Sequence, residues 1–202
     1  MSVKIIFNFI KQKIWFIIKK KKNLKHLGKG SFINTSIKIS KKQISCGANV
    51  YIWKNSRIEA VTKWGNKIYF PDIIFEEGVS IQQNLHLTCA KKVFIGKNTA
   101  IVSNVTITDI IHLHTIPNLP ILQQDIEVKE VYIGESSTIY SNVVILPGTI
   151  IGKNTIIGAN SVVSGIFPDY CVIVGAPAKI VKRYCFEQQK WRKTDNKGNF
   201  IE

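Results

Sequence analysis

The C-terminal half of the chain repeats an apolar residue every six positions. A period of six matches neither the 3.6-residue repeat of a helix nor the alternation of an open strand. It fits a chain that coils, with a short strand and a corner in each hexad, so that the repeating residue faces a shared core. We therefore predict an all-β coil in which three hexads form one triangular turn. The residues that begin these hexads are Ile133, Ile139, Ile145, Ile151, Ile157 and Val163, so that Ile133 should stack on Ile151, Ile139 on Ile157 and Ile145 on Val163.

The fourth and fifth positions of the hexads predict tight corners. The fourth position is usually Asn, and it is Gly at Gly148; both residues adopt left-handed backbone conformations at the least cost. The fifth position is small or β-branched, which suits a narrow interior. An ordinary sandwich strand, which alternates with period two, would not keep Asn in phase. The asparagines are Asn49, Asn55, Asn84, Asn98, Asn104, Asn142, Asn154 and Asn160.

The same register occurs in three earlier blocks, and the phase slips between blocks. The blocks are Cys46–Ile52–Ile58, Phe75–Ile81–Leu87 and Ile95–Ile101–Ile107. The segment from Ile107 to Ile133 is two residues longer than a whole number of hexads. We therefore expect a loop insertion at residues 109–130. Insertions in a repeat protein form loops on the binding face.

Composition agrees with one modest domain. A chain of 202 residues with 45% hydrophobic content can bury a continuous core without disulfides or a structural metal. The four cysteines are scattered and form no CxxC pair, so we expect reduced thiols that pack inside the protein. They are Cys46, Cys89, Cys171 and Cys185.

The net charge of +15 is concentrated at the N-terminal end. No acidic residue precedes Glu59, and this first part of the chain carries 13 lysines and Arg57. The rest of the chain has 14 basic and 13 acidic residues and is nearly neutral. We therefore expect no nucleic-acid partner, because the basic character belongs to a leader and not to the body of the protein.

Several segments of the chain resemble a known protein family. The run "VYIGESSTIYSNVVILPGTIIGKNTIIGANSVVSGIFPDYCVIVGAPAKIVKR" resembles the C-terminal half of hexapeptide-repeat acetyltransferases. The segments "SRIEAV", "IQQNLHLT" and "ITDIIHLH" resemble the branch that O-acetylates cell-surface polysaccharides. The resemblance covers residues 30–185 approximately. It implies a left-handed parallel β-helix, a homotrimer, acetyl-CoA as donor and active sites between neighbouring subunits.

The resemblance implies that His112 is the catalytic base. Thr108-Asp109-Ile110-Ile111-His112 matches the family string Thr-Asp-x-x-His. A sugar hydroxyl is a poor nucleophile at neutral pH, and an imidazole with a pKa near 6.5 can accept its proton. Many relatives carry a second His where Ile110 stands, and here His114 follows instead, so His114 is the alternative base. Asp109 either orients the base or bonds the backbone of its own turn.

The resemblance also places the two substrates. Asn84 and His86 match the position where related enzymes hold the acceptor sugar, although Asn84 is also a corner residue. On the donor side, Ser141 and Ala159 align with backbone groups along the pantetheine arm, and the Ser141 amide is a candidate to face the oxyanion. Further donor-side candidates are Ser164 and a basic cluster that would meet the coenzyme A phosphates, namely Lys179, Lys182 and Arg183.

The first 28 residues have the pattern of a basic amphipathic helix. Lysines interrupt the apolar positions too often for a membrane span, and a signal peptide would need a longer uncharged stretch and a cleavage site. We expect a cytoplasmic protein whose residues 1–22 contact the anionic inner face of the plasma membrane. Docking on the protein's own trimer or on a partner protein is the alternative. The coil would follow at residues 29–185 and a C-terminal tail at 186–202.

The predicted activity is acetyl-CoA-dependent O-acetylation of a sugar hydroxyl on a cell-surface polysaccharide or its lipid-linked precursor. N-acetylation of a nucleotide-linked amino sugar is the main alternative. A trimeric zinc carbonic anhydrase would need three imidazole ligands, for which His86, His112 and His114 are candidates. The ending Gly175-Ala-Pro-Ala-Lys179 is a donor-site feature and favours acetyl transfer, with no metal. A non-catalytic scaffold is the third class.

Overall fold

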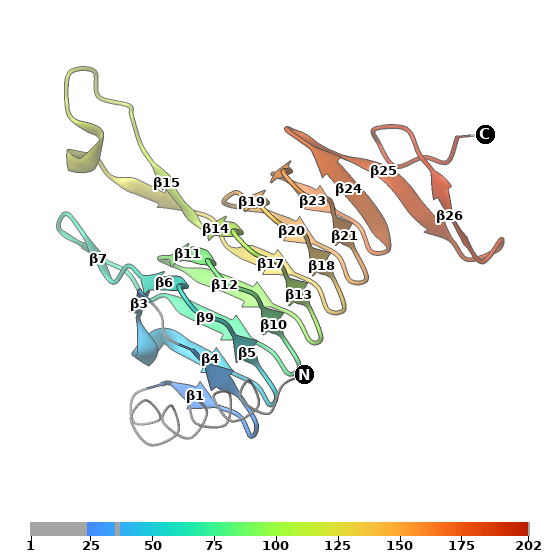
Figure 1. Ribbon diagram of the computed structural model, residues 1–202. Coiled ribbons are helices and arrows are strands. Elements are labelled where there is room, and N and C mark those ends of the chain that lie inside the picture. The colour runs from blue at the N-terminus through green and yellow to red at the C-terminus, as the bar shows by residue number, and fades with distance from the viewer. Residues whose placement is uncertain (1–23, 35–36, 202) are drawn as a thin grey trace.

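The computed structural model describes residues 24–34 and 37–201, and in it the chain winds into a left-handed parallel β-helix with three flat faces (Figure 1). Each face is a parallel sheet that takes one short strand from each turn. Sheet A contains β1 (His26–Leu27), β4 (Ile44–Cys46), β9 (Asp72–Phe75), β12 (Lys92–Ile95), β17 (Val131–Ile133), β20 (Ile150–Ile151) and β23 (Ile166–Phe167). Sheet C contains β22 (Val162–Val163), β19 (Val144–Ile145), β14 (Thr106–Thr108), β11 (His86–Cys89), β6 (Arg57–Ala60) and β3 (Lys38–Ile39).

Sheet B differs from the other two because an antiparallel hairpin extends it at its C-terminal end. Its parallel strands are β2 (Phe32–Ile33), β5 (Tyr51–Ile52), β10 (Ser80–Ile81), β13 (Ala100–Ile101), β18 (Thr138–Ile139), β21 (Ile156–Ile157) and β24 (Cys171–Gly175), and β25 (Ala178–Cys185) and β26 (Lys190–Lys193) follow. The segment predicted as a tail therefore contributes β26 to the fold. A 3-10 helix at Lys41–Gln43 precedes β4.

The core confirms the six-residue register. Ile133 pairs with Ile151, Ile139 with Ile157 and Ile145 with Val163, each one turn apart. All six side chains are fully buried, as are those that begin the earlier hexads Cys46, Phe75 and Ile95. Burial of this apolar column supplies the main driving force for the fold. All four cysteines are buried and free, as expected, and burial raises the pKa of the Cys46 thiol to about 12.

The corners also follow the prediction. The eight corner asparagines have positive φ between 52° and 66°, and Gly148 has φ of 78°. At the corner between sheets B and C, the side-chain amides form a ladder along the coil. Asn84 donates to Asn104 at 2.8 Å, Asn104 to Asn142 at 3.1 Å and Asn142 to Asn160 at 3.0 Å.

Two insertions leave the coil at the corner between sheets C and A. The first is the hairpin of β7 (Lys63–Trp64) and β8 (Lys67–Ile68), and the second contains β15 (Ile110–His112), a 3-10 helix (Ile121–Gln123) and β16 (Ile126–Val128). Figure 1 shows both hairpins projecting from the same side of the coil. The turn between them passes from β11 to β12 through a short corner without an insertion.

The coil begins earlier than predicted. β1 already pairs with β4 in sheet A, so the parallel coil starts at His26 and not at residue 29. The rest of the predicted leader helix, including residues 1–22, lies outside the described residues. Among the described residues, no helix is long and apolar enough to cross a bilayer.

Candidate active site

A cavity of about 360 Å³, lined by polar and apolar side chains, lies where the two insertions meet. The first insertion and β6 supply one wall, and β14 with the second insertion supplies the opposite wall. The intervening turn has no insertion, so its strand β11 forms the floor. The lining residues are Arg57, Glu59, Val61, Trp64, Thr88, Thr106, Thr108, Ile110 and His112.

His112 ends β15 and lines this cavity. Its ring packs edge-on against Trp64, with ring centroids 4.8 Å apart and planes at 67°. Trp64 is held in turn by its indole Nε1, which donates to the backbone oxygen of Gln124 at 2.8 Å. The Nδ1 atom of His112 is buried and has no hydrogen-bond partner within the described part of the chain. The imidazole is thus fixed by packing, with Nδ1 on its buried side.

His114 lies outside the cavity. It is exposed, two residues beyond the end of β15, and it does not line the pocket. The loop that follows is held by Gln124, whose side chain bonds the backbone of Ile116 and the carbonyl of Leu119 at 2.8–3.2 Å. Of the two candidate bases, the geometry favours His112.

Asp109 is fully buried and bonds the neighbouring corner. Its carboxylate accepts hydrogen bonds from the amides of Ala90, Lys91 and Lys92 at 2.7–2.9 Å and from the Cys89 thiol at 3.3 Å. Burial raises the pKa of this carboxyl, and the amide hydrogen bonds offset only part of the effect. Asp109 therefore stabilises the short corner of the preceding turn, and not the backbone of its own turn as one of the two predicted roles would have it.

The cavity contains one carboxylate, that of Glu59, and two cations hold it. Arg57 donates to it through Nε at 2.9 Å and also through Nη2, and Lys38 donates from the preceding turn. Burial opposes ionisation of Glu59, but the hydrogen bonds and charges of Lys38 and Arg57 outweigh it and lower the pKa of the carboxyl. The Glu59 side chain is 16% exposed. Glu59 is thus a preorganised anion at neutral pH.

Neither of the two predicted acceptor residues is among those that line the cavity, although His86 borders it. Asn84 occupies a corner with φ of 66° and its amide belongs to the asparagine ladder. His86 is exposed on the outer face of sheet C, paired with Arg57 on one side and Thr106 on the other. His86 therefore lies two positions along the strand from Thr88, the floor residue of the cavity.

Two predicted donor-side residues stack at the corner between sheets B and C. Ser141 lies beside Ser103, with hydroxyl oxygens 3.3 Å apart, and its carbonyl accepts the amide of Asn160. The Ser141 amide itself donates to no described group. Ala159 is exposed one turn further on, and Ser164 is exposed at the other edge of sheet C. Within one chain, the corner that holds Ser141 and Ala159, here called the donor corner, precedes the strands of sheet C, whereas His112 lies beyond the other end of these strands.

The predicted basic cluster divides between the two faces of β25. Lys182 pairs with the outward-facing Val172, whereas Arg183 pairs with the buried Cys171. Because successive side chains in a strand point to opposite faces, Lys182 and Arg183 diverge. A bulge between Val172 and Ile173 brings the exposed Lys179 opposite Val174, which is also exposed.

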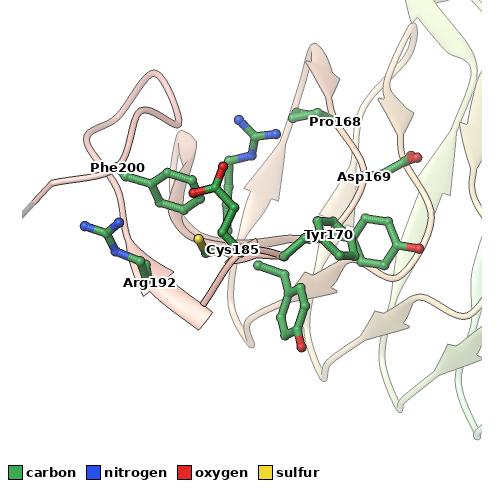
Figure 2. Close-up of a pocket in the computed structure, with 10 residues that line it drawn as sticks. Pro168, Asp169, Tyr170, Cys185, Arg192 and Phe200 are labelled. Atoms are coloured by element: carbon green, nitrogen blue, oxygen red, sulfur yellow. The ribbon is translucent and has the colours of Figure 1, made fainter. Parts of the chain in front are cut away.

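Arg183 instead lines a pocket of about 780 Å³ at the C-terminal end of the coil (Figure 2). It donates to the carbonyl of Gly198 at 3.4 Å. On the other wall, Arg192 lies over the ring of Phe200 at 5.0 Å. The structure thus brings Lys179 and Lys182 to one face of the strand and separates Arg183 from them.

The described residues contain no group of three His, Cys, Asp or Glu side chains that could hold a metal ion. The three histidines considered as zinc ligands, His86, His112 and His114, are thus not gathered within one chain.

Comparison with known proteins identifies the repeat. Residues 130–165 match the family model described as bacterial transferase hexapeptide, six repeats. This stretch therefore carries the six-residue repeat that the family model describes. WbbJ of Escherichia coli K12, named for O-acetyl transfer in lipopolysaccharide biosynthesis, is 40% identical over 130 residues, which are 60% of this chain and 65% of WbbJ. Galactoside O-acetyltransferase of Lactococcus lactis is 33% identical over 114 residues, which are 55% of this chain and 53% of that protein. The chain thus spans between half and two thirds of the length of these two relatives.

Solved structures share the hexapeptide fold. AntD, an N-acyltransferase from Bacillus cereus solved with dTDP and 3-hydroxybutyryl-CoA, superposes with a TM-score of 0.69 at 18% identity, covering 84% of this chain and 88% of AntD. The hexapeptide-repeat acetyltransferase VCA0836 from Vibrio cholerae gives 0.56 at 20% identity, covering 85% and 80%. These likenesses agree with the β-helix seen in Figure 1.

Sequence reasoning missed the first insertion's part in the site. The phase slip between Ile58 and Phe75 indicates a loop there, just as the later slip does. It did not indicate that Trp64 reaches the second insertion, nor that Glu59 faces the same cavity as His112. Such contacts join two non-repeating segments, whose relative positions no period specifies.

Proposed function

We propose that the protein transfers an acetyl group from acetyl-CoA to a saccharide hydroxyl of a cell-surface polysaccharide or of its lipid-linked precursor. The observation that carries the proposal is the setting of His112, an imidazole held by packing against Trp64 in the wall of a cavity that also contains a carboxylate and threonine hydroxyls. The two relatives named as O-acetyltransferases support the reaction class.

His112 acts as the general base. Its neutral imidazole accepts the proton of the acceptor hydroxyl as the hydroxyl oxygen attacks the thioester carbonyl. The carbon–sulfur bond then breaks, and coenzyme A leaves as a thiol with the proton returned by the imidazolium. Base catalysis of this kind contributes roughly a hundred- to ten-thousand-fold. His114 is exposed and does not line the cavity, so it would need a rearrangement of the loop to take this role.

The donor site and the base come together between subunits. Ser141 and Ala159 lie across sheet C from His112 in one chain, so we propose a homotrimer in which the donor corner of one subunit faces the cavity of the next. The unpartnered Ser141 amide then stabilises the developing oxyanion. Lys179 and Lys182 bind the coenzyme A phosphates from the outward face of β25.

The N-terminal segment would hold the enzyme at the inner face of the plasma membrane. This proposal rests on the charge pattern of residues 1–22, whose lysines suit an anionic surface. Removing residues 1–22 should reduce binding to anionic vesicles and leave transfer to a soluble acceptor unchanged.

The second candidate is N-acetylation of a nucleotide-linked amino sugar. It is suggested by AntD, an N-acyltransferase with the same fold. Incubating the full chain with acetyl-CoA and a panel of neutral and amino sugars separates the two reactions. Mild alkali removes an acetyl group from an ester and leaves an amide intact. Alkali-labile product supports O-transfer; alkali-stable product formed only on amino sugars would replace it by N-transfer.

A further inference from the structure

We propose that the cavity between the two insertions is the acceptor subsite, and that Glu59 there accepts a hydrogen bond from a hydroxyl group of a neutral sugar ring. This proposal rests on the proposed function. It moves acceptor recognition away from Asn84 and His86, which the resemblance suggested. Neither of those residues lines the cavity.

The carboxylate of Glu59 is built to accept hydrogen bonds. Arg57 and Lys38 fix its position from two strands of sheet C, so the side chain does not need to be ordered when a ligand arrives. An ionised carboxylate has about four lone-pair sites, and Arg57 and Lys38 already donate three hydrogen bonds to it, which leaves acceptor capacity for one ligand hydroxyl. The cavity is thus equipped to accept a hydrogen bond from one sugar hydroxyl.

The remaining walls suit a sugar as well. The hydroxyls of Thr88 and Thr108 are 2.8 Å apart, and Thr108 also accepts the amide of Ile110 at 3.1 Å. Opposite them, Trp64 presents an aromatic surface of the kind that packs against the C–H groups of a sugar ring. A volume of about 360 Å³ falls at the lower end of the range for small-ligand sites and fits one monosaccharide unit.

The charges of the cavity favour a neutral ring over an acidic one. The Arg57 guanidinium is already paired with the Glu59 carboxylate through two of its nitrogens, so its positive charge is largely compensated and attracts a second carboxylate or a phosphate less strongly. A uronic acid would bring its own negative charge towards Glu59. We therefore expect neutral hexosides to bind and their uronic acid counterparts to be rejected.

The test is direct binding followed by kinetics on the full chain. Methyl hexopyranosides and the matching methyl hexuronides are added without donor, and the imidazole NMR signal of His112 is followed. The variants are Glu59→Gln and Thr88→Val, with Glu127→Gln as the control, because Glu127 is an exposed insertion residue paired only with Lys129. KM for hexoside and for acetyl-CoA is then measured wherever transfer occurs.

We expect a neutral hexoside to shift the His112 signal in the wild type and the Glu127→Gln control. Glu59→Gln should raise the hexoside dissociation constant and KM by roughly ten- to a hundredfold and leave KM for acetyl-CoA unchanged. Binding of no hexoside, or equal hexoside affinity in Glu59→Gln, Thr88→Val and wild type, would overturn the subsite. Hexoside binding without acetyl transfer would support the subsite and rule out the proposed function. Acetyl transfer with the same KM for hexoside in Glu59→Gln and wild type would support the proposed function and rule out the subsite.

Discussion

The indole N–H of Trp64 donates to the backbone carbonyl of Gln124, 60 residues away in sequence, and the same ring lies edge-on against His112. This contact joins the two insertions above the uninterrupted turn. A second link, the ion pair of Lys67 with Asp125 at 2.8 Å, connects the same two segments. The orientation of the proposed base therefore depends on a hairpin that precedes its own loop by two turns of the coil.

Trp64 should act as a positioning residue for His112. Trp64→Ala removes both contacts, and we expect turnover to fall about tenfold to a hundredfold, because small displacements of a catalytic group are costly. KM for acetyl-CoA should stay the same. Trp64→Phe keeps an edge-on ring without the hydrogen bond and should recover part of the turnover, with Trp191→Phe as the distant control. Equal turnover in Trp64→Ala and wild type would contradict this role.

Asp109 should contribute to stability through the corner that it caps. Asp109→Ala leaves the amides of Ala90, Lys91 and Lys92 without their partner. The free energy of unfolding should fall by about 3 kcal/mol, since a buried donor left unpaired costs about 1–3 kcal/mol. Asp125→Ala, which breaks an exposed ion pair, should cost less than about 1 kcal/mol. Similar chemical denaturation midpoints for the two variants would refute the assignment.

The asparagine ladder should be worth measuring at Asn142, which has φ of 62°. Asn142→Gly keeps access to the left-handed conformation and loses only the amide bonds to Asn104 and Asn160. Asn142→Ala loses the amide bonds and also the easy access to the left-handed conformation. It should therefore be less stable than Asn142→Gly by roughly 1 kcal/mol. Thermal unfolding of both variants measures the difference. An alanine variant as stable as the glycine variant would contradict the expected cost of the left-handed conformation at this corner.

The ion pairs of Glu59 should give a stability contribution that depends on pH. Because the pKa of Glu59 in the fold lies below 4.5, the contribution is present in full above pH 4.5 and is lost as the pH falls through the lowered pKa. Wild type should therefore unfold at a higher temperature than Glu59→Gln at pH 7, and the two should converge in more acidic solution. A difference that persists unchanged down to pH 3 would exclude this origin.

The repeat made the fold predictable in detail. One period defines the neighbour of every core residue, so Ile133 could be paired with Ile151 and the corners placed at Asn142 and Asn154 from the sequence. The same reasoning fails where the period stops. The contact of Trp64 with His112 depends on how two irregular segments fold, and nothing in the repeat specifies it.

The sequence predicted only part of the arrangement of the candidate site residues. His112 and His114 both follow the phase slip, but only the structure distinguishes the one that lines the cavity from the one that is exposed. Arg183 was grouped with Lys182 by charge, although consecutive residues of a strand face opposite ways. Two roles were equally compatible with Asp109 in the sequence, and its hydrogen bonds go to a third partner, the corner at Ala90–Lys92, whose proximity the sequence does not reveal.

The most direct test is alkali-labile acetyl transfer by the full chain and by His112→Asn. The wild type should form an acetyl ester from acetyl-CoA and a neutral sugar, and His112→Asn should lose roughly a hundred- to ten-thousandfold of the turnover while still binding acetyl-CoA. His114→Asn, the matched control, should retain its turnover. Ester formation that survives His112→Asn, or that disappears in His114→Asn instead, would contradict the assignment of His112 as the base.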